Sequence, residues 1–160
     1  MPNSTTPPRP RDDERYPRGT AYHEAGHAVV AFALDVRVVS VRVVFTEEKG
    51  WHGGTDTPEG AADQLSWEDR ITMRIAGKAA EELFDCPADP LASLHDLGEI
   101  DSLLNRMGMS DEREARIAAG KARARIILQQ HRERALRLIG HLVDHGRIDE
   151  AEFKRLMSDE

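Results

Sequence analysis

The sequence predicts a mainly α-helical fold with a small β-sheet, which places the chain in the α+β class. Apolar residues recur at three- and four-residue intervals over most of the chain after residue 20, which is the spacing of amphipathic helices. Only residues 36–45 and 51–57 are strand-like, and the turn signal Lys49-Gly50 separates them. A length of 160 residues suits one domain with its own hydrophobic core.

The helix boundaries follow from capping residues and breakers. Ser66, followed by Glu68 and Asp69, has the features of an N-cap before an acidic first turn. Proline and glycine are typical of positions just beyond a helix end. The expected helices are residues 20–34, residues 66–86 before Pro87, residues 95–107 ended by Gly108, residues 110–145 with a break near Gly120 and Gln130, and residues 148–157 started by Asp149.

The second strand-like segment contains Gly53 and Gly54, which weaken it as a regular strand. Glycine inside a strand indicates either a β-bulge or a close approach by another part of the protein. We therefore expect one of these two features at this point of the sheet.

The first 19 residues differ in composition from the rest of the chain. They hold five of the eight prolines and four arginines, and almost nothing that a core could bury. Because such a segment cannot offset the entropy lost on ordering, we expect residues 1–19 to be a disordered, inert arm and residues 20–158 to be the folded domain. The arm lacks the apolar stretch of a signal peptide, and no apolar run is long enough to span a bilayer, so we expect a cytoplasmic location without a membrane partner.

The charge of the chain argues against several functions. A net charge of −7, from 22 Lys and Arg against 29 Asp and Glu, gives no overall attraction to nucleic acid or anionic lipid. Residues 112–137 carry eight bases and three acids. Since apolar residues are interleaved with these bases and no aromatic platform accompanies them, we interpret the segment as a solvated helix face and expect no nucleic-acid partner. The single cysteine, Cys86, excludes a disulfide framework and a multi-cysteine metal cage, and we expect an unpaired thiol.

The segment that carries chemistry is His23-Glu24-Ala25-Gly26-His27. Histidines four residues apart on a helix lie one turn apart on nearly the same face, so both imidazoles can bind one tetrahedral ion at roughly 2.0–2.1 Å. Glu24 lies beside them, where a carboxylate can take a proton from a metal-activated water without binding the metal. Gly26 costs about 1 kcal/mol relative to alanine inside a helix, which indicates close packing against this turn.

A catalytic zinc ion generally has three protein ligands and one open position. The candidates for the third ligand cluster in residues 93–101, at the start of a helix. They are His95, Asp96, Glu99 and Asp101, and spacing alone does not choose among them.

These segments resemble the protease domain of the FtsH family of membrane-anchored, ATP-dependent zinc metalloproteases. Residues 22–28 are similar to the zinc-binding helix of that family, and residues 75–83 resemble its Gly-Gly-Arg-Ala-Ala-Glu-Glu segment, with Ala76 and Lys78 as departures. Asp96 precedes the Arg106-Met107 pair by the family's spacing. The resemblance covers residues 20–157.

The resemblance implies an FtsH-like zinc metallopeptidase domain. It assigns His23, His27 and Asp96 as ligands of one zinc ion per chain, and Glu24 as the catalytic base. The family has asparagine where this chain has His95, so the other three candidates stay open as alternatives to Asp96.

In the family, a strand beside the zinc-binding helix pairs with the substrate backbone. The matching residues here, which the resemblance assigns to substrate binding, are Trp51, His52, Gly53, Gly54 and Thr55. An ordinary edge strand is the alternative interpretation, with His52 at the surface.

The resemblance also covers an acidic pair, Glu81 and Glu82. We expect both to make surface or packing contacts, and the alternative is that one of them orients a zinc-bound imidazole.

FtsH enzymes also carry an AAA+ ATPase and a membrane segment, and neither occurs in this sequence. The expected activity is therefore hydrolysis of peptide bonds in unfolded or flexible polypeptides, with ATP dependence only through a separate ATPase partner. A homo-oligomer stays open, because family members form rings. The alternative function is a catalytically weak, zinc-containing module that binds peptides or docks to a partner.

Overall fold

The computed structural model describes residues 17–158, and residues 1–16 of the expected arm lie outside the described residues. The α+β class is confirmed: helices dominate, and three antiparallel strands form one small sheet. The helices are α1 (Pro17–Ala33), α2 (Trp67–Leu83), α3 (Pro90–Arg106), α4 (Arg113–Gln130), α5 (Arg132–His145) and α6 (Glu150–Met157). The strands are β1 (Ser40–Thr46), β2 (Gly50–Asp56) and β3 (Arg147–Asp149), and short 3-10 helices cover Ala61–Gln64 and Ser110–Glu112.

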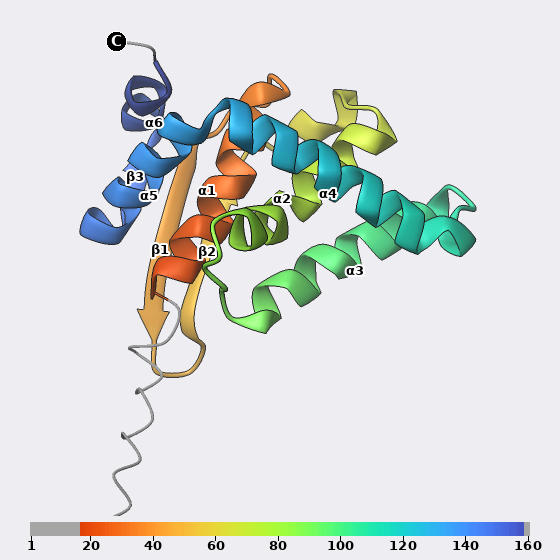
Figure 1. Ribbon diagram of the computed structural model, residues 1–160, viewed down its shortest axis with the longest axis horizontal. Helices are drawn as coiled ribbons and strands as arrows, with labels where there is room; N and C mark the ends of the chain where they lie inside the picture. Colours follow the sequence, from red (N-terminus) through yellow and green to blue (C-terminus); the bar gives the residue numbers. More distant parts are fainter. Residues whose placement is uncertain (1–16, 159–160) are drawn as a thin grey trace, which may run out of the picture.

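The sheet has the strand order β2-β1-β3, so β1 is central and β2 lies at an edge. β1 pairs with β2 over its whole length, from Ser40 opposite Asp56 to Thr46 opposite Gly50. Figure 1 shows this hairpin lying along α1. Within the described residues, the outer edge of β2 therefore has no strand paired with it.

Helix α1 lies between the sheet and α2, and its small side chains allow this close packing. Ala21, Ala25 and Ala28 are fully buried or nearly so. A side-chain carbon at Gly26 would lie 2.5 Å from the carbonyl oxygen of Ala76 on α2, too close for any residue except glycine. The close packing expected at Gly26 is confirmed, and it fixes the helix that carries both histidines.

A second, smaller core holds α3 against α2. It contains Ile71 and Ile75 from α2 and Ile100, Leu103 and Leu104 from α3, all of them buried. The three residues of α3 lie in its C-terminal half. Its N-terminal half contains Asp96, which contacts His23 on α1.

Several expected boundaries are wrong by a few residues. The first helix begins at Pro17 instead of near residue 20, and proline is favoured in a first turn because its missing N–H has no partner there anyway. The third helix begins at Pro90 instead of at His95, with Asp89 as its N-cap accepting from the Leu91 N–H at 3.0 Å. The first strand begins at Ser40, because residues 36–39 form a connector before it.

The long helical region breaks at His131, near the expected Gln130 but not at Gly120. A side-chain carbon at Gly120 would lie 2.9 Å from Ile71 Cγ2, so this glycine permits close packing of α4 on α2. A sheet of two or three strands was expected, but the position of the third strand, β3, was not. Asp149 caps α6 as expected by accepting from the Glu152 N–H at 2.9 Å.

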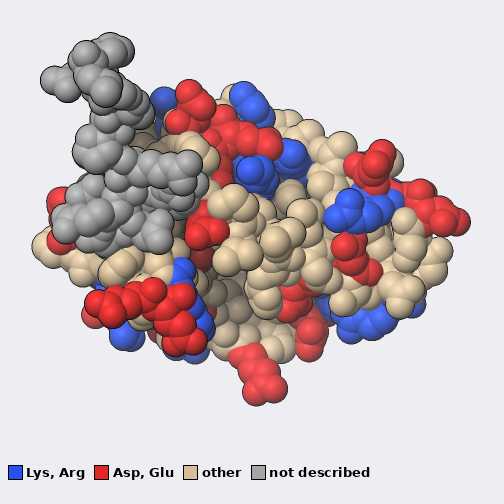
Figure 2. Space-filling view, turned by 90° about the horizontal axis from the view of Figure 1, so that it is seen from below, with Lys and Arg blue, Asp and Glu red and all other residues tan. Residues whose placement is uncertain are grey.

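Three bases of the basic stretch, residues 112–137, pair with acids of α2 and α3. Arg123 pairs with Asp69, Lys121 with Glu82, and Arg113 with Asp101. On the face seen in Figure 2, acidic and basic side chains lie side by side instead of gathering in one basic patch. Among residues 17–158, no helix combines the length and apolar character needed to cross a bilayer.

Candidate metal centre

Helix α1 presents both histidines to the same point in space. His23 and His27 lie four residues apart, and their Nε2 atoms are 3.1 Å from each other. His23 is buried, with 2% of its surface exposed, and His27 is half-buried. The helical spacing therefore produces the convergence that the sequence predicts.

Helix α3 supplies the third donor. Asp96 Oδ2 lies 3.0 Å from His23 Nε2 and 3.1 Å from His27 Nε2. Ligand atoms about 2.0–2.1 Å from a tetrahedral ion are roughly 3.3 Å from one another, so the three donor atoms form nearly one face of that tetrahedron. Among the described residues, this trio is the only group of three or more His, Cys, Asp or Glu whose donor atoms are close enough to hold a metal ion.

The structure directs the other third-ligand candidates elsewhere. Glu99 lies 3.7 Å from both Arg74 and His95, and Asp101 pairs with Arg113. Of the four candidates in residues 93–101, only Asp96 lies beside the imidazoles.

The other ring nitrogens of the two histidines are held by acceptors. His23 Nδ1–H donates to Glu81 Oε2 at 2.7 Å, and His27 Nδ1–H donates to the carbonyl oxygen of Met73 at 2.9 Å. A proton fixed on each Nδ1 leaves the Nε2 lone pair free to bind a metal, which is the arrangement of metal-ligating histidines. The residues present therefore fit a zinc ion.

Glu81 is the hydrogen-bond partner of His23, and the sequence indicated a histidine contact at this position only as an alternative. It is 4% exposed, and its second carboxylate oxygen accepts from the Ala88 N–H at 2.7 Å, so both oxygens are engaged. The expectation of a surface contact is wrong for Glu81, which is buried and bonds to His23; that it orients a zinc-bound imidazole stays a prediction. Glu82 is at the surface, 3.2 Å from Lys121.

Gly77 provides the seat of the His23 imidazole. A side-chain carbon on this glycine of α2 would lie 2.5 Å from His23 Cε1 and Nε2. Since real side chains do not approach so closely, the ring rests directly on the α2 backbone.

The metal-free centre has strongly shifted protonation equilibria. Burial lowers the pKa of His23, but its bonds to Asp96 and Glu81 outweigh this effect and raise the pKa to about 9. Burial raises the pKa values of Asp96 and Glu81, yet the bonds to the histidines hold both below their ordinary values. At neutral pH the metal-free centre therefore holds an imidazolium between two carboxylates, and metal binding must release its proton.

Glu24 lies next to His23 in the sequence and in the same cleft as the three donors. The residue is 7% exposed, and its Oε2 accepts from the Thr55 hydroxyl at 2.9 Å. A buried carboxylate held by one hydrogen bond beside the donor trio is suited to transfer protons there.

The cleft around these residues has a volume of about 740 Å³. One wall is α1, another is the start of α3 with Leu91 and His95, and a third is strand β2. The five residues that the sequence assigns to substrate binding line this cleft together with the candidate ligands and Glu24; they are Trp51, His52, Gly53, Gly54 and Thr55. We refer to it as the metal cleft.

The glycines of β2 permit a close approach and form no bulge. Gly53 pairs with Val43 and Gly54 with Arg42 in regular register. A side-chain carbon at Gly53 would lie 2.8 Å from Glu24 Cγ, so the strand touches the stem of this glutamate. Of the two expected alternatives, the close approach is confirmed.

Comparison with curated proteins finds a partial relative. It is the ATP-dependent zinc metalloprotease FtsH 2 of Sphaerobacter thermophilus, 41% identical over an alignment of 78 residues that covers 46% of this chain and 12% of that protein. A region of this chain is related to FtsH 2. A scan against models of known protein families finds no match. The related region supports a coarse kinship with metalloproteases, and the chain spans only a small part of that relative's length.

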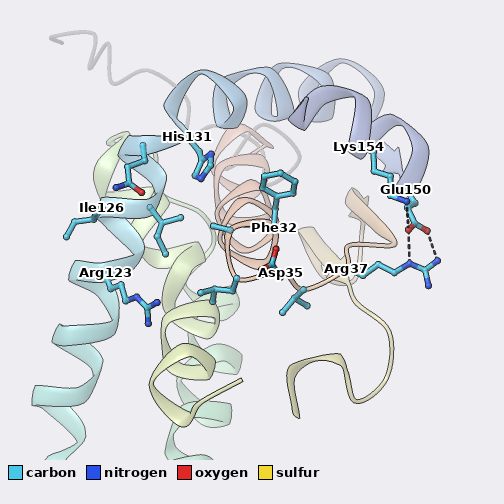
Figure 3. A pocket seen from close by; sticks show the side chains of 13 residues that line it. Phe32, Asp35, Arg37, Arg123, Ile126, His131, Glu150 and Lys154 are labelled. Atoms are coloured by element: carbon cyan, nitrogen blue, oxygen red, sulfur yellow. Dashed lines mark hydrogen bonds and ion pairs between the residues drawn. The ribbon is translucent and has the colours of Figure 1, made fainter. Parts of the chain in front are cut away.

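A second pocket, of about 910 Å³, lies at the C-terminal end of α1 (Figure 3). Phe32 and Ile126 give it an apolar lining. Arg37 donates from Nε and Nη2 to the two carboxylate oxygens of Glu150, at 2.7 Å each. Lys154 lies 3.4 Å from the same carboxylate. The Glu150 carboxylate is thus paired with two cationic side chains of this pocket.

Proposed function

We propose that this chain is a zinc-dependent metalloendopeptidase that hydrolyses peptide bonds of unfolded or flexible polypeptides. The observation that carries the proposal is the convergence of His23, His27 and Asp96 in a cleft that also contains a buried glutamate, Glu24. The partial relationship to a zinc metalloprotease supports the same chemistry.

His23 Nε2, His27 Nε2 and Asp96 Oδ2 would hold one zinc ion per chain. When bound, zinc supplies Lewis acidity, which polarises a peptide carbonyl and makes water a stronger acid. Glu24 takes the proton from the attacking water and delivers it to the leaving amine, so that one carboxylate serves both proton transfers. Glu81 and the Met73 carbonyl would hold each imidazole with its proton on Nδ1, so that Nε2 can bind the zinc ion.

The substrate backbone would pair with the outer edge of β2, which lines the metal cleft from Trp51 to Thr55. Only an extended segment can add a strand to an edge, so the substrates are unfolded or flexible polypeptides. Folded substrates would need a separate ATPase that unfolds them. The cytoplasmic location, the absence of nucleic-acid and membrane partners, and the homo-oligomer stay predictions.

The test is cleavage of an unstructured protein such as casein by protein loaded with one equivalent of zinc. We expect turnover that a chelator stops and added zinc restores. Glu24→Gln should reduce the rate by about 10²–10⁴-fold with unchanged zinc content, because it removes the group that moves the protons. Casein binding without cleavage by the zinc-loaded wild type would support the peptide-binding alternative, and unchanged activity in Glu24→Gln would refute the role of Glu24.

A further inference from the structure

The Thr55 hydroxyl makes two contacts, both with Glu24. Thr55 Oγ1 lies 2.9 Å from Glu24 Oε2 and 3.0 Å from the Glu24 carbonyl oxygen. A hydroxyl has a single hydrogen, so these two oxygens of one residue share one donor. The Thr55 hydroxyl thus links the carboxylate of Glu24 to the backbone carbonyl of the same residue.

Strand β2 also restrains the other end of the same side chain. Gly53, two residues before Thr55, faces the same way, and a side-chain carbon there would lie 2.8 Å from Glu24 Cγ. The stem of Glu24 thus lies on the β2 backbone while its carboxylate is held by the next inward-facing residue of that strand. A glutamate on a helix ordinarily samples several rotamers, and this pair of contacts selects one of them.

We propose that Thr55 is a positioning residue for the general base, an inference that rests on the proposed function. Its hydroxyl holds one carboxylate oxygen of Glu24 and leaves the other for proton transfer. Because a displacement of about 1 Å in a reacting group can cost as much as 10²-fold in rate, fixing this carboxylate matters to the chemical step. Thr55 acts through Glu24 and itself takes no proton from the substrate.

Thr55 lies on β2, the edge strand of the sheet, so its bond to Glu24 connects this strand to the proposed base. The strand proposed to pair with the substrate backbone is also the strand that holds the base. The register of the scissile bond and the position of the carboxylate are therefore set by one rigid element. Loss of the hydroxyl should leave strand pairing intact and impair only the step that uses Glu24.

The experiment compares Thr55→Val and Thr55→Ser with wild type in zinc-dependent casein cleavage. Valine keeps the shape and removes the hydroxyl, so we expect kcat to fall by about tenfold or more while KM and zinc content stay unchanged. Serine keeps the hydroxyl and should restore most of kcat. Thr72→Val is the matched control, because the buried Thr72 hydroxyl donates only to the Glu68 carbonyl within α2, and it should leave kcat unchanged.

Wild-type kcat in Thr55→Val, a change confined to KM or to zinc content, or a serine variant as slow as the valine variant would each overturn the proposal. If zinc-loaded wild type does not cleave casein, the proposed function fails. Crystal structures of zinc-loaded wild type and Thr55→Val then still test whether Thr55 positions the Glu24 carboxylate. A Glu24 carboxylate in a new rotamer, or without order, in the valine variant supports the positioning role. An unchanged carboxylate overturns it.

Discussion

The two pockets associated with α1 contain similar kinds of residues but use their charges in opposite ways. In the second pocket, Arg37 and Glu150 face each other at an exposed site, and such pairs contribute little to stability or chemistry. In the metal cleft, His23, Glu24 and Asp96 are buried, and two imidazole nitrogens and a carboxylate oxygen converge within 3.1 Å of one another. Convergence of buried donors therefore identifies the candidate site.

Asp96→Asn gives the largest expected effect and tests this difference directly. Asparagine keeps the size of the side chain but replaces the carboxylate with a neutral amide, a much weaker zinc ligand, so we expect zinc affinity to fall by more than the roughly 100-fold limit of an outer-shell change. Competition with a chromogenic chelator measures this. Glu150→Gln in the second pocket is the control and should leave the affinity unchanged; equal losses in both variants would remove the distinction between the pockets.

The pH dependence of metal binding sharpens the same comparison. Since His23 in the metal-free centre has a pKa of about 9, zinc displaces a proton at every lower pH. Apparent affinity should therefore rise by about tenfold per pH unit up to about pH 9 and level off above it. An affinity that is flat between neutral pH and pH 9 would show that His23 is not a protonated ligand residue in the metal-free protein.

The same shift links pH to the stability of the metal-free protein. The pKa of His23 is raised from 6.5 in the unfolded chain to about 9 in the folded one. Its contribution to the free energy of unfolding is fully present below pH 6.5 and is lost as the pH rises through about 9. Thermal unfolding with a chelator present should show a falling melting temperature over this interval, and His23→Gln should abolish the trend.

Glu81→Gln and Glu82→Gln form a matched pair on adjacent positions of α2. The buried Glu81 holds the His23 ring, so its replacement should weaken zinc binding by about 10–100-fold. The exposed Glu82 contacts Lys121 and should be neutral in the same titration. If Glu82→Gln weakens binding as much as Glu81→Gln, the effect comes from the charge of α2 in general and not from the contact with His23.

The smallest expected effects on stability come from alanine substitutions at two glycines within helices, Gly77 and Gly140. Gly77→Ala places a methyl group within 2.5 Å of the His23 ring and should both destabilise the protein and weaken zinc binding. Gly140→Ala on α5 meets open space and should stabilise the fold by about 0.5–1 kcal/mol through helix propensity. Denaturant unfolding measures both changes. A neutral Gly77→Ala variant would show that the imidazole has room to move.

Local parts of this molecule could be predicted from the sequence, and contacts between distant residues could not. The i, i+4 spacing of His23 and His27 on a helix is a local property, and the structure reproduces it. The sequence spacing left Asp96 as one of four candidates, because the position of its side chain depends on how α3 packs on α2. Only the family resemblance favoured it. The partnership of His23 with Glu81 spans 58 residues, and no local pattern records it.

The errors in the expected fold have related causes. Gly120 was interpreted as a helix break because glycine has low helix propensity, whereas it serves the packing of α4 on Ile71. The Asp89-Pro90 pair is a regular N-cap followed by a proline at the first helical position, and this signal at the start of α3 was missed. Strand β3 has three residues, too few for an alternating pattern, so only its pairing with β1 defines it.

A crystal structure of the zinc-loaded protein, with the ion located by its anomalous scattering, tests the proposed metal site most directly. We expect one ion within about 2.2 Å of His23 Nε2, His27 Nε2 and a carboxylate oxygen of Asp96, with a fourth position facing the metal cleft. An ion held by His95, Glu99 or Asp101 in place of Asp96, or a centre that stays metal-free in excess zinc, would contradict this expectation.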